Sequence, residues 1–401
     1  MVYQNVLIFA SFILLYSLMA KRLEKTILSG PFLTVIAGVI MGPLLLNMIN
    51  LKVGIEGYRI IAELALALVL FTDASNTDIR GLMRNVSIPV RLLLIGLPLT
   101  ILLGMFGGFI LFKGFSWIEL GILATLLAPT DAALGKAVVT NQKVPTRIRE
   151  SLNVESGLND GICVPVLFFL IALFTFQTEE GIKFPSGLIL FAEEIGIGLI
   201  AGLTTTFIVD RLVHYAENHE GISKSWKTIV IIALAFSCFA SAQLAGGSGF
   251  IACFSGGLLY SVINRKYKHD LLEEAEGAGD TLSMLTWIIF GSVVVASSLK
   301  FFSWEVIIYA LLSLTFIRMV PVVISLVNSG ISGKEKLFIG WFGPRGLASI
   351  VFAIIVFDVD LPHKETIILT AVCTILLSII LHGFTANPFI SILNKNVSKA
   401  S

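Results

Sequence analysis

The chain has 401 residues, of which 56% are hydrophobic and only 14% are charged, and its mean hydropathy is +0.91. This composition excludes an ordinary soluble domain and predicts a protein whose solvent is the lipid bilayer. The formal net charge of +1 excludes a strongly basic nucleic-acid-binding protein, so we expect contact with membrane lipids and no nucleic-acid partner.

Apolar stretches recur along the whole chain, and a helix that crosses a bilayer needs about 20 mostly apolar residues. The predicted spans are 4–20, 31–46, 57–74, 87–111, 117–138, 150–176, 186–210, 226–245, 249–263, 280–298, 303–327, 336–357 and 364–392. The first is expected to be retained, because no small-residue cleavage site marks it as a signal peptide. The sequence therefore predicts an all-α membrane protein with about thirteen transmembrane helices in one domain, 1–401.

The Lys and Arg residues are distributed unequally between the two sides of these spans. Nineteen fall on one side and six on the other, and with Lys136, Arg318 and Arg345 in or beside spans they account for all 28. Cytoplasmic loops are enriched in both residue types. We therefore expect a multi-pass protein of the cell (inner) membrane, with its N-terminus outside and its C-terminus in the cytoplasm.

The fifth and twelfth spans are both interrupted by helix-breaking residues, at 128–131 (APTD) and 343–346 (GPRG). These two spans occupy corresponding positions if the chain divides into six spans, one linking span and six more. Corresponding spans of the two repeats are then seven spans apart. Each span reverses the direction of the chain through the membrane, so this odd number predicts that the second six-helix repeat is inverted relative to the first. Paired broken spans indicate a transport site near the bilayer midplane.

The first interruption carries a carboxylate. Thr130 and Asp131 follow Pro129, which cannot donate a backbone hydrogen bond and so loosens the helix. A charge at the bilayer centre costs about 2.5–3.5 kcal/mol or more, which makes such a residue a candidate for function. Freed carbonyls beside a carboxylate suit a hard cation such as Na⁺ or K⁺. The alternative is an aspartate that only caps a helix at a kink.

The sixth span carries a second group of oxygen-bearing side chains. Glu155, Ser156, Asn159 and Asp160 fall on one face of a helix at about 100° per residue. Two carboxylates, a hydroxyl and an amide on one face predict ion ligands, and the alternative is a structural polar network between helices.

Two arginines lie within apolar spans. Arg318 is central in 303–327, and Arg345 belongs to the second interruption. A buried arginine needs a carboxylate or a set of carbonyls. Glu155 is the expected partner of Arg318, which leaves Asp160 and Asp131 for transport. The alternative for Arg318 is a purely structural ion pair. The alternative for Arg345 is a side chain that extends to the polar end of its helix.

Other side chains give weaker signals. The four cysteines lie in apolar stretches without a CxxC or Cys/His pattern, which favours buried packing over disulfides or zinc. His382 stands alone in the last span. The serine in 246–250 has no partnered base, so we expect no enzyme, and no cofactor apart from the transported ions.

Three segments resemble the signature segments of NhaP-type monovalent cation/proton antiporters, which are related to sodium/hydrogen exchangers. They are 127–139 (LAPTDAALGKAVV), 153–161 (NVESGLNDG) and 342–352 (FGPRGLASIVF), and the likeness in motif order and hydropathy covers essentially the whole chain. The resemblance implies the sodium/proton antiporter fold and homodimers. A core bundle (about 87–176 and 303–392) would move against dimerisation helices (about 1–74 and 186–298).

Carried over residue by residue, the resemblance puts the cation on Asp160, Asp131, Ser156 and the carbonyl of Thr130. Asn159 would lie beside them, and Glu155 would pair with a core arginine. In that family an Asn-Asp pair is associated with electroneutral exchange, which implies one cation per proton here.

The expected function is therefore the exchange of a monovalent cation for H⁺ in pH homeostasis, with alternating access and with Asp160 as the shared site. Na⁺ is favoured, and K⁺ and Li⁺ stay open. The alternatives are a transporter of the same fold for another solute, such as an anion, and an uncoupled cation channel.

Overall fold

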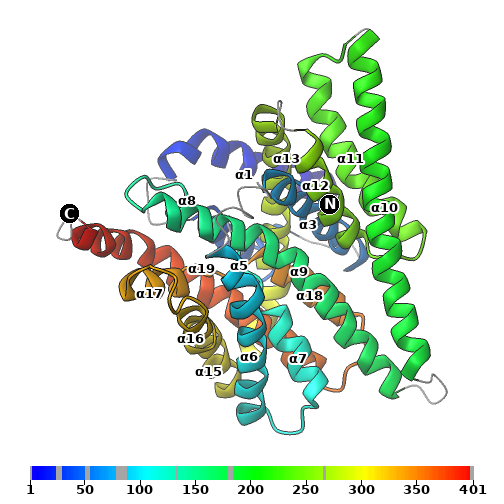
Figure 1. Ribbon diagram of the computed structural model, residues 1–401. Helices are drawn as coiled ribbons and strands as arrows, with labels where there is room; N and C mark the ends of the chain where they lie inside the picture. The colour runs from blue at the N-terminus through cyan, green and yellow to red at the C-terminus, as the bar shows by residue number, and fades with distance from the viewer. Residues whose placement is uncertain are drawn as a thin grey trace. The chain divides into compact units, whose positions relative to one another are not determined.

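The computed structural model describes residues 2–23, 29–49, 55–77, 88–131, 134–178, 184–219, 221–264 and 268–397. Within these ranges the regular secondary structure is entirely helical (Figure 1), as the composition predicts.

Each predicted span coincides with a helix or a run of helices. The single helices are α1 (Val2–Leu23), α2 (Gly30–Met41), α3 (Ile55–Asn76), α9 (Thr146–Thr178), α10 (Phe184–His219), α11 (Lys224–Leu244), α12 (Gly249–Ile263) and α19 (Lys364–Val397). The runs are α5–η1–α6 (Pro89–Arg91, Leu92–Gly96, Leu97–Leu111), α7 and α8 (Trp117–Leu126, Lys136–Val139), α13–η2–α14–η3 (Lys268–Ile289, Phe290–Val295, Ala296–Ser298, Leu299–Phe301), α15 and α16 (Trp304–Leu314, Phe316–Ser325), and α17 and α18 (Gly333–Trp341, Leu347–Phe357).

Eight of the helices in the described ranges are long and apolar enough to cross a membrane, by length and composition. Four further apolar helices, α2, α7, α12 and α18, are shorter. Two of these, α7 and α18, are halves of interrupted spans, so their length follows from the breaks that the sequence predicts.

The chain divides into two compact units. The first unit comprises Met1–Ala62, Val86–Asn159 and Ser283–Ser401. In it α6 packs on α7, and α19 packs on α15 and α18. Two clusters of buried apolar side chains lie in this unit, one centred on Leu92, Ile148, Val322, Phe338 and Ile390, the other on Val35, Trp287, Phe290, Ile350 and Ile375.

Both interrupted spans belong to the first unit. In each, the first half-helix begins with a capping box, formed by Ser116 with Glu119 in α7 and by Ser332 with Glu335 in α17. These reciprocal hydrogen bonds satisfy N–H groups that have no partner within the helix. The helices then end at Leu126 and Trp341, just before the proline-containing breaks.

The second unit comprises Glu63–Asn85 and Asp160–Leu282. Its helices α10, α11 and α12 pack pairwise, and α10 and α11 run side by side in Figure 1, in green. The approach of α10 to α12 is close, because a β-carbon on Gly202 would lie 2.2 Å from the carbonyl oxygen of Ala252. Small residues permit such close packing of membrane helices.

Candidate functional site

The two interruptions lie against each other within the first unit, although about two hundred residues separate them in the chain. The backbone N–H of Asp131 donates to the carbonyl oxygen of Pro344 at 2.8 Å. The guanidinium of Arg345 donates to the carbonyl oxygens of Ala128 at 2.7 Å and Pro129 at 3.1 Å. These two carbonyls lie in the break just past the end of α7, where no helical N–H reaches them, and a cation suits the negative end of the helix dipole.

The carboxylate of Asp131 caps the helical turns that follow both breaks. Its Oδ1 accepts a hydrogen bond from the N–H of Leu134 at 3.0 Å, and its Oδ2 accepts one from the N–H of Leu347 at 2.8 Å. A β-carbon on Gly346 would lie 1.8 Å from Oδ2, so only glycine leaves room for this contact. The capping role that the sequence left as an alternative for Asp131 is therefore present.

Three buried polar side chains converge beside this carboxylate. The hydroxyl of Ser156 donates to the carbonyl oxygen of Thr130, and the amide of Asn159 donates to Thr130 Oγ1 at 2.7 Å. Asn159 Oδ1 is buried and receives no hydrogen bond from the part of the protein that the structure describes. The group therefore presents a carbonyl oxygen, two hydroxyls and an amide oxygen in one place.

A cavity of about 10 Å³ adjoins these side chains and is lined in part by Thr130, Asp131, Ser156 and Pro344. This volume is close to the room that one water molecule needs. The cavity has room for at most one water-sized ligand, with the oxygen-bearing residues on one side and apolar side chains such as Val138, Leu152 and Phe342 on the other.

Glu155 and Arg318 form a buried ion pair in the first unit. Arg318 Nη1 lies 2.6 Å from Glu155 Oε1, and the two side chains are 2% and 3% exposed. Arg318 also packs against the second break, because a β-carbon on Gly343 would lie 2.6 Å from its Nε. Of the two buried arginines, the one that pairs with Glu155 is thus Arg318, and Arg345 binds carbonyls.

Asp160 follows Asn159 in α9, which continues without interruption, and it is buried at 8% exposure. It belongs to the second unit, whereas the other predicted site residues belong to the first. The first unit thus brings together Thr130, Asp131, Ser156, Asn159, Glu155, Arg318 and Arg345. The role of Asp160 stays a prediction.

Two serines that the sequence did not single out also hold the breaks. The Ser349 hydroxyl donates to the carbonyl oxygen of Leu126 at 2.9 Å, and Ser378 Oγ accepts from the N–H of Arg345 at 2.7 Å. Each is fully buried in an apolar helix. A lone serine in an apolar helix is weak evidence for a contact with another segment, because its hydroxyl can also donate to the carbonyl oxygen one turn earlier in its own helix.

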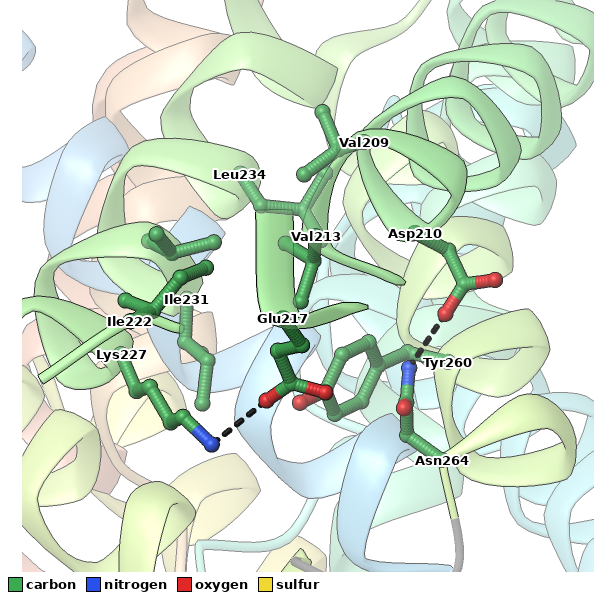
Figure 2. Close-up of a pocket in the computed structure, with 11 residues that line it drawn as sticks. Val209, Asp210, Val213, Glu217, Ile222, Lys227, Ile231, Leu234, Tyr260 and Asn264 are labelled. Carbon is green, nitrogen blue, oxygen red and sulfur yellow. Dashed lines mark hydrogen bonds and ion pairs between the residues drawn. The ribbon is translucent and has the colours of Figure 1, made fainter. Parts of the chain in front are cut away.

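A second cavity, of about 40 Å³, lies in the second unit among α10, α11 and α12 (Figure 2). Four of its polar side chains form two pairs. Lys227 pairs with Glu217 at 2.5 Å, and the amide of Asn264 donates to Asp210 at 2.8 Å. Such internal pairing is typical of a structural polar cluster.

The model of the family described as "Sodium/hydrogen exchanger, transmembrane" matches residues 7–392. The K⁺/H⁺ antiporter NhaP2 of Shewanella baltica is 23% identical over 326 residues, which are 81% of this chain and 55% of that protein. The K⁺/H⁺ antiporter NhaP of Alkalimonas amylolytica is 24% identical over 85% of this chain and 58% of its own length. The Na⁺/H⁺ antiporter of Schizosaccharomyces pombe is 24% identical over 72% of this chain and 69% of its own length. The chain thus spans little more than half the length of the two bacterial relatives.

A solved structure, that of the sodium proton antiporter MjNhaP1 from Methanocaldococcus jannaschii, matches 95% of this chain and 99% of its own. The TM-score is 0.78 and the sequence identity is 21%. The predicted all-α membrane fold of the antiporter type is thereby confirmed.

Proposed function

Because the chain belongs to the sodium/hydrogen exchanger family of transmembrane proteins, we propose that it exchanges a monovalent cation for a proton across the membrane. The observation that carries the proposal is the crossing of two broken spans beside the oxygen atoms of Thr130, Ser156 and Asn159. Carbonyl, hydroxyl and amide oxygens suit Na⁺ and K⁺. The names of the relatives, which include K⁺/H⁺ and Na⁺/H⁺ antiporters, support either cation.

Asp160 is the proposed shared site for the cation and the proton. Its carboxylate directly follows the oxygen-bearing residues in α9 and is buried. A buried carboxylate is stable when it carries a proton or a cation and costly when it carries neither. A site whose carboxylate carries neither a proton nor a cation is therefore rarely transferred across the membrane, which couples the cation flux to the proton flux.

Asp131 has a different proposed role. Both of its carboxylate oxygens accept backbone hydrogen bonds at the starts of helical turns. A negative charge suits that position, where helix dipoles point their positive ends. Asp131 would therefore attract the cation electrostatically and hold the two breaks together, without carrying a proton of its own through the cycle. With Asn159 beside Asp160, one exchangeable carboxylate remains, which supports electroneutral one-for-one exchange.

The proposed setting is the cell membrane, where the protein would act in pH homeostasis. We propose a homodimer with its N-terminus outside, in which the core bundle alternates access by moving against the dimerisation helices. The basic residues on one side of the spans support this orientation.

The rival solute, an anion, would need arginines that are available to it. Arg318 is paired with Glu155, and Arg345 donates to the carbonyl oxygens of the first break. The charge of Arg318 is thus neutralised by a carboxylate and that of Arg345 faces carbonyl oxygens, which favours a cation.

Purified protein in sealed liposomes tests the proposal. An outward pH gradient is imposed, and Na⁺, K⁺ or Li⁺ is added while an internal dye reports pH. We expect at least one of these cations to drive proton movement, and choline to drive none. Protein that passes no protons with any of the three, or that carries cation current without proton movement, would contradict the proposal.

A further inference from the structure

His382 of α19 lies beside the second break and contacts residues on both sides of it. The ring is buried, at 3% exposure. Its Nε2 lies 2.8 Å from the carbonyl oxygen of Trp341, the last residue of α17. A carbonyl oxygen only accepts, so this contact is a hydrogen bond in the tautomer that carries its proton on Nε2.

The other ring nitrogen faces Ser378, one turn earlier in α19. His382 Nδ1 lies 2.9 Å from the Ser378 carbonyl oxygen and 3.2 Å from its hydroxyl oxygen. That hydroxyl accepts the backbone hydrogen bond of Arg345 at 2.7 Å. A connected series of polar contacts therefore runs from Trp341, before the break, through His382 and Ser378 to Arg345, within it.

A third residue of α19 contributes to the same face. Thr385 Oγ1 accepts a hydrogen bond from the indole Nε1 of Trp341 at 2.9 Å. Ser378, His382 and Thr385 are spaced by four and three residues, which puts them on one side of a helix. α19 thus holds the end of α17 and the start of the break with side-chain hydrogen bonds.

The position of this break sets the position of the cation site. The carbonyl oxygen of Pro344 accepts the N–H of Asp131, and the N–H of Leu347 donates to the Asp131 carboxylate. If the segment 342–346 moves, Asp131 and the neighbouring Thr130 carbonyl must move with it. Ion affinity is sensitive to such displacements, because oxygen ligands must lie at set distances from the ion.

We propose that His382, together with Ser378, is a positioning residue for cation binding: it holds the second break where Asp131 and Thr130 form their part of the site. This proposal rests on the proposed exchange function, which makes the oxygen atoms of Asp131 and Thr130 part of a cation site. Neither residue is proposed to contact the ion or to exchange a proton.

The test compares four substitutions in the full chain. His382→Leu removes both ring nitrogens, and Ser378→Ala removes only the hydroxyl. His382→Gln keeps a donor at the distance of Nε2. Thr374→Val is the matched control, because Thr374 is equally buried in α19 but its hydroxyl donates only to the Thr370 carbonyl within that helix.

We expect His382→Leu and Ser378→Ala to raise the cation KM about tenfold, the factor that corresponds to the net contribution of one buried hydrogen bond. The maximal rate per folded protein should change less than twofold. His382→Gln should recover most of the affinity, and Thr374→Val should leave KM unchanged. A merely structural role would instead lower the amount of folded protein at unchanged KM, and that result would overturn the proposal.

Backbone hydrogen exchange of the segment 342–346 gives a second readout that needs no transport. Ser378→Ala removes the acceptor of the Arg345 N–H, so exchange there should accelerate relative to wild type and to Thr374→Val. Unchanged exchange would show that α19 does not hold the break. A wild-type protein without cation/proton exchange would reject the proposed function, while this measurement would still decide the role of His382 and Ser378.

Discussion

The carboxylate of Asp131 accepts a hydrogen bond from the backbone N–H of Leu347 at 2.8 Å, across 216 residues of sequence. Leu347 is the first residue of α18, and the other carboxylate oxygen accepts the N–H of Leu134. One side chain of the first break therefore caps the helix that follows the second break.

Asp131→Asn should destabilise the protein. An amide offers one acceptor, so one of the two backbone N–H groups would face an NH₂ group. Leaving a buried donor unsatisfied costs about 1–3 kcal/mol. Thermal unfolding in detergent measures the loss, with Asp360→Asn as the control because that side chain is exposed. Equal melting of wild type and Asp131→Asn would argue against a capping role.

Gly346→Ala should displace the second break. The new methyl group would lie 1.8 Å from Asp131 Oδ2, so the cap must open. Overpacking of this kind costs about 1–3 kcal/mol, and we expect cation-driven proton flux to fall with it. Gly333→Ala is the matched control, since no other helix or side chain in the described part of the protein lies within 4 Å of its added β-carbon. If both variants melt and transport alike, the close approach at Gly346 has no consequence.

Glu155→Gln and Arg318→Gln should each destabilise the protein by about 3–5 kcal/mol, because each leaves a buried charge without its partner. The double substitution removes both charges and should recover part of the loss. Chemical unfolding of the four proteins gives the coupling energy. Strictly additive effects would show that the pair is not coupled.

Asp160→Asn should abolish exchange and leave the protein folded, in the same oligomeric state as the wild type. The neutral amide resembles the protonated acid in shape but cannot exchange a proton for a cation. Liposomes with the variant should show no cation-driven pH change, while the variant elutes from a size-exclusion column at the same volume as the wild type. Persistent flux would remove Asp160 from the shared site.

Exchange should be independent of membrane voltage if one cation crosses per proton. A potassium-diffusion potential set with valinomycin tests this, with sodium-driven proton movement as the readout and lithium or choline salts to control for potassium transport. The initial rate should not change with the imposed potential. A steep voltage dependence would reject the one-for-one cycle and would point to Asp131 or Glu155 as the carrier of a second proton.

The sequence alone determined the spans, the two breaks and the residues that carry oxygen atoms. These are local properties: an apolar stretch of about 20 residues predicts a membrane helix, and a proline interrupts that helix whatever the helix packs against. The helical period likewise put Ser156 and Asn159 on one face.

Only the tertiary structure decided which of these groups bond to each other. Asp131 caps a helix more than 200 residues away, and His382, which the sequence left alone in its span, holds the second break, whereas the pair of Glu155 with Arg318 was already expected. Each contact joins atoms about 3 Å apart from distant parts of the chain. Composition and periodicity specify the face on which a side chain lies, but the packing of whole helices determines the atom that it meets.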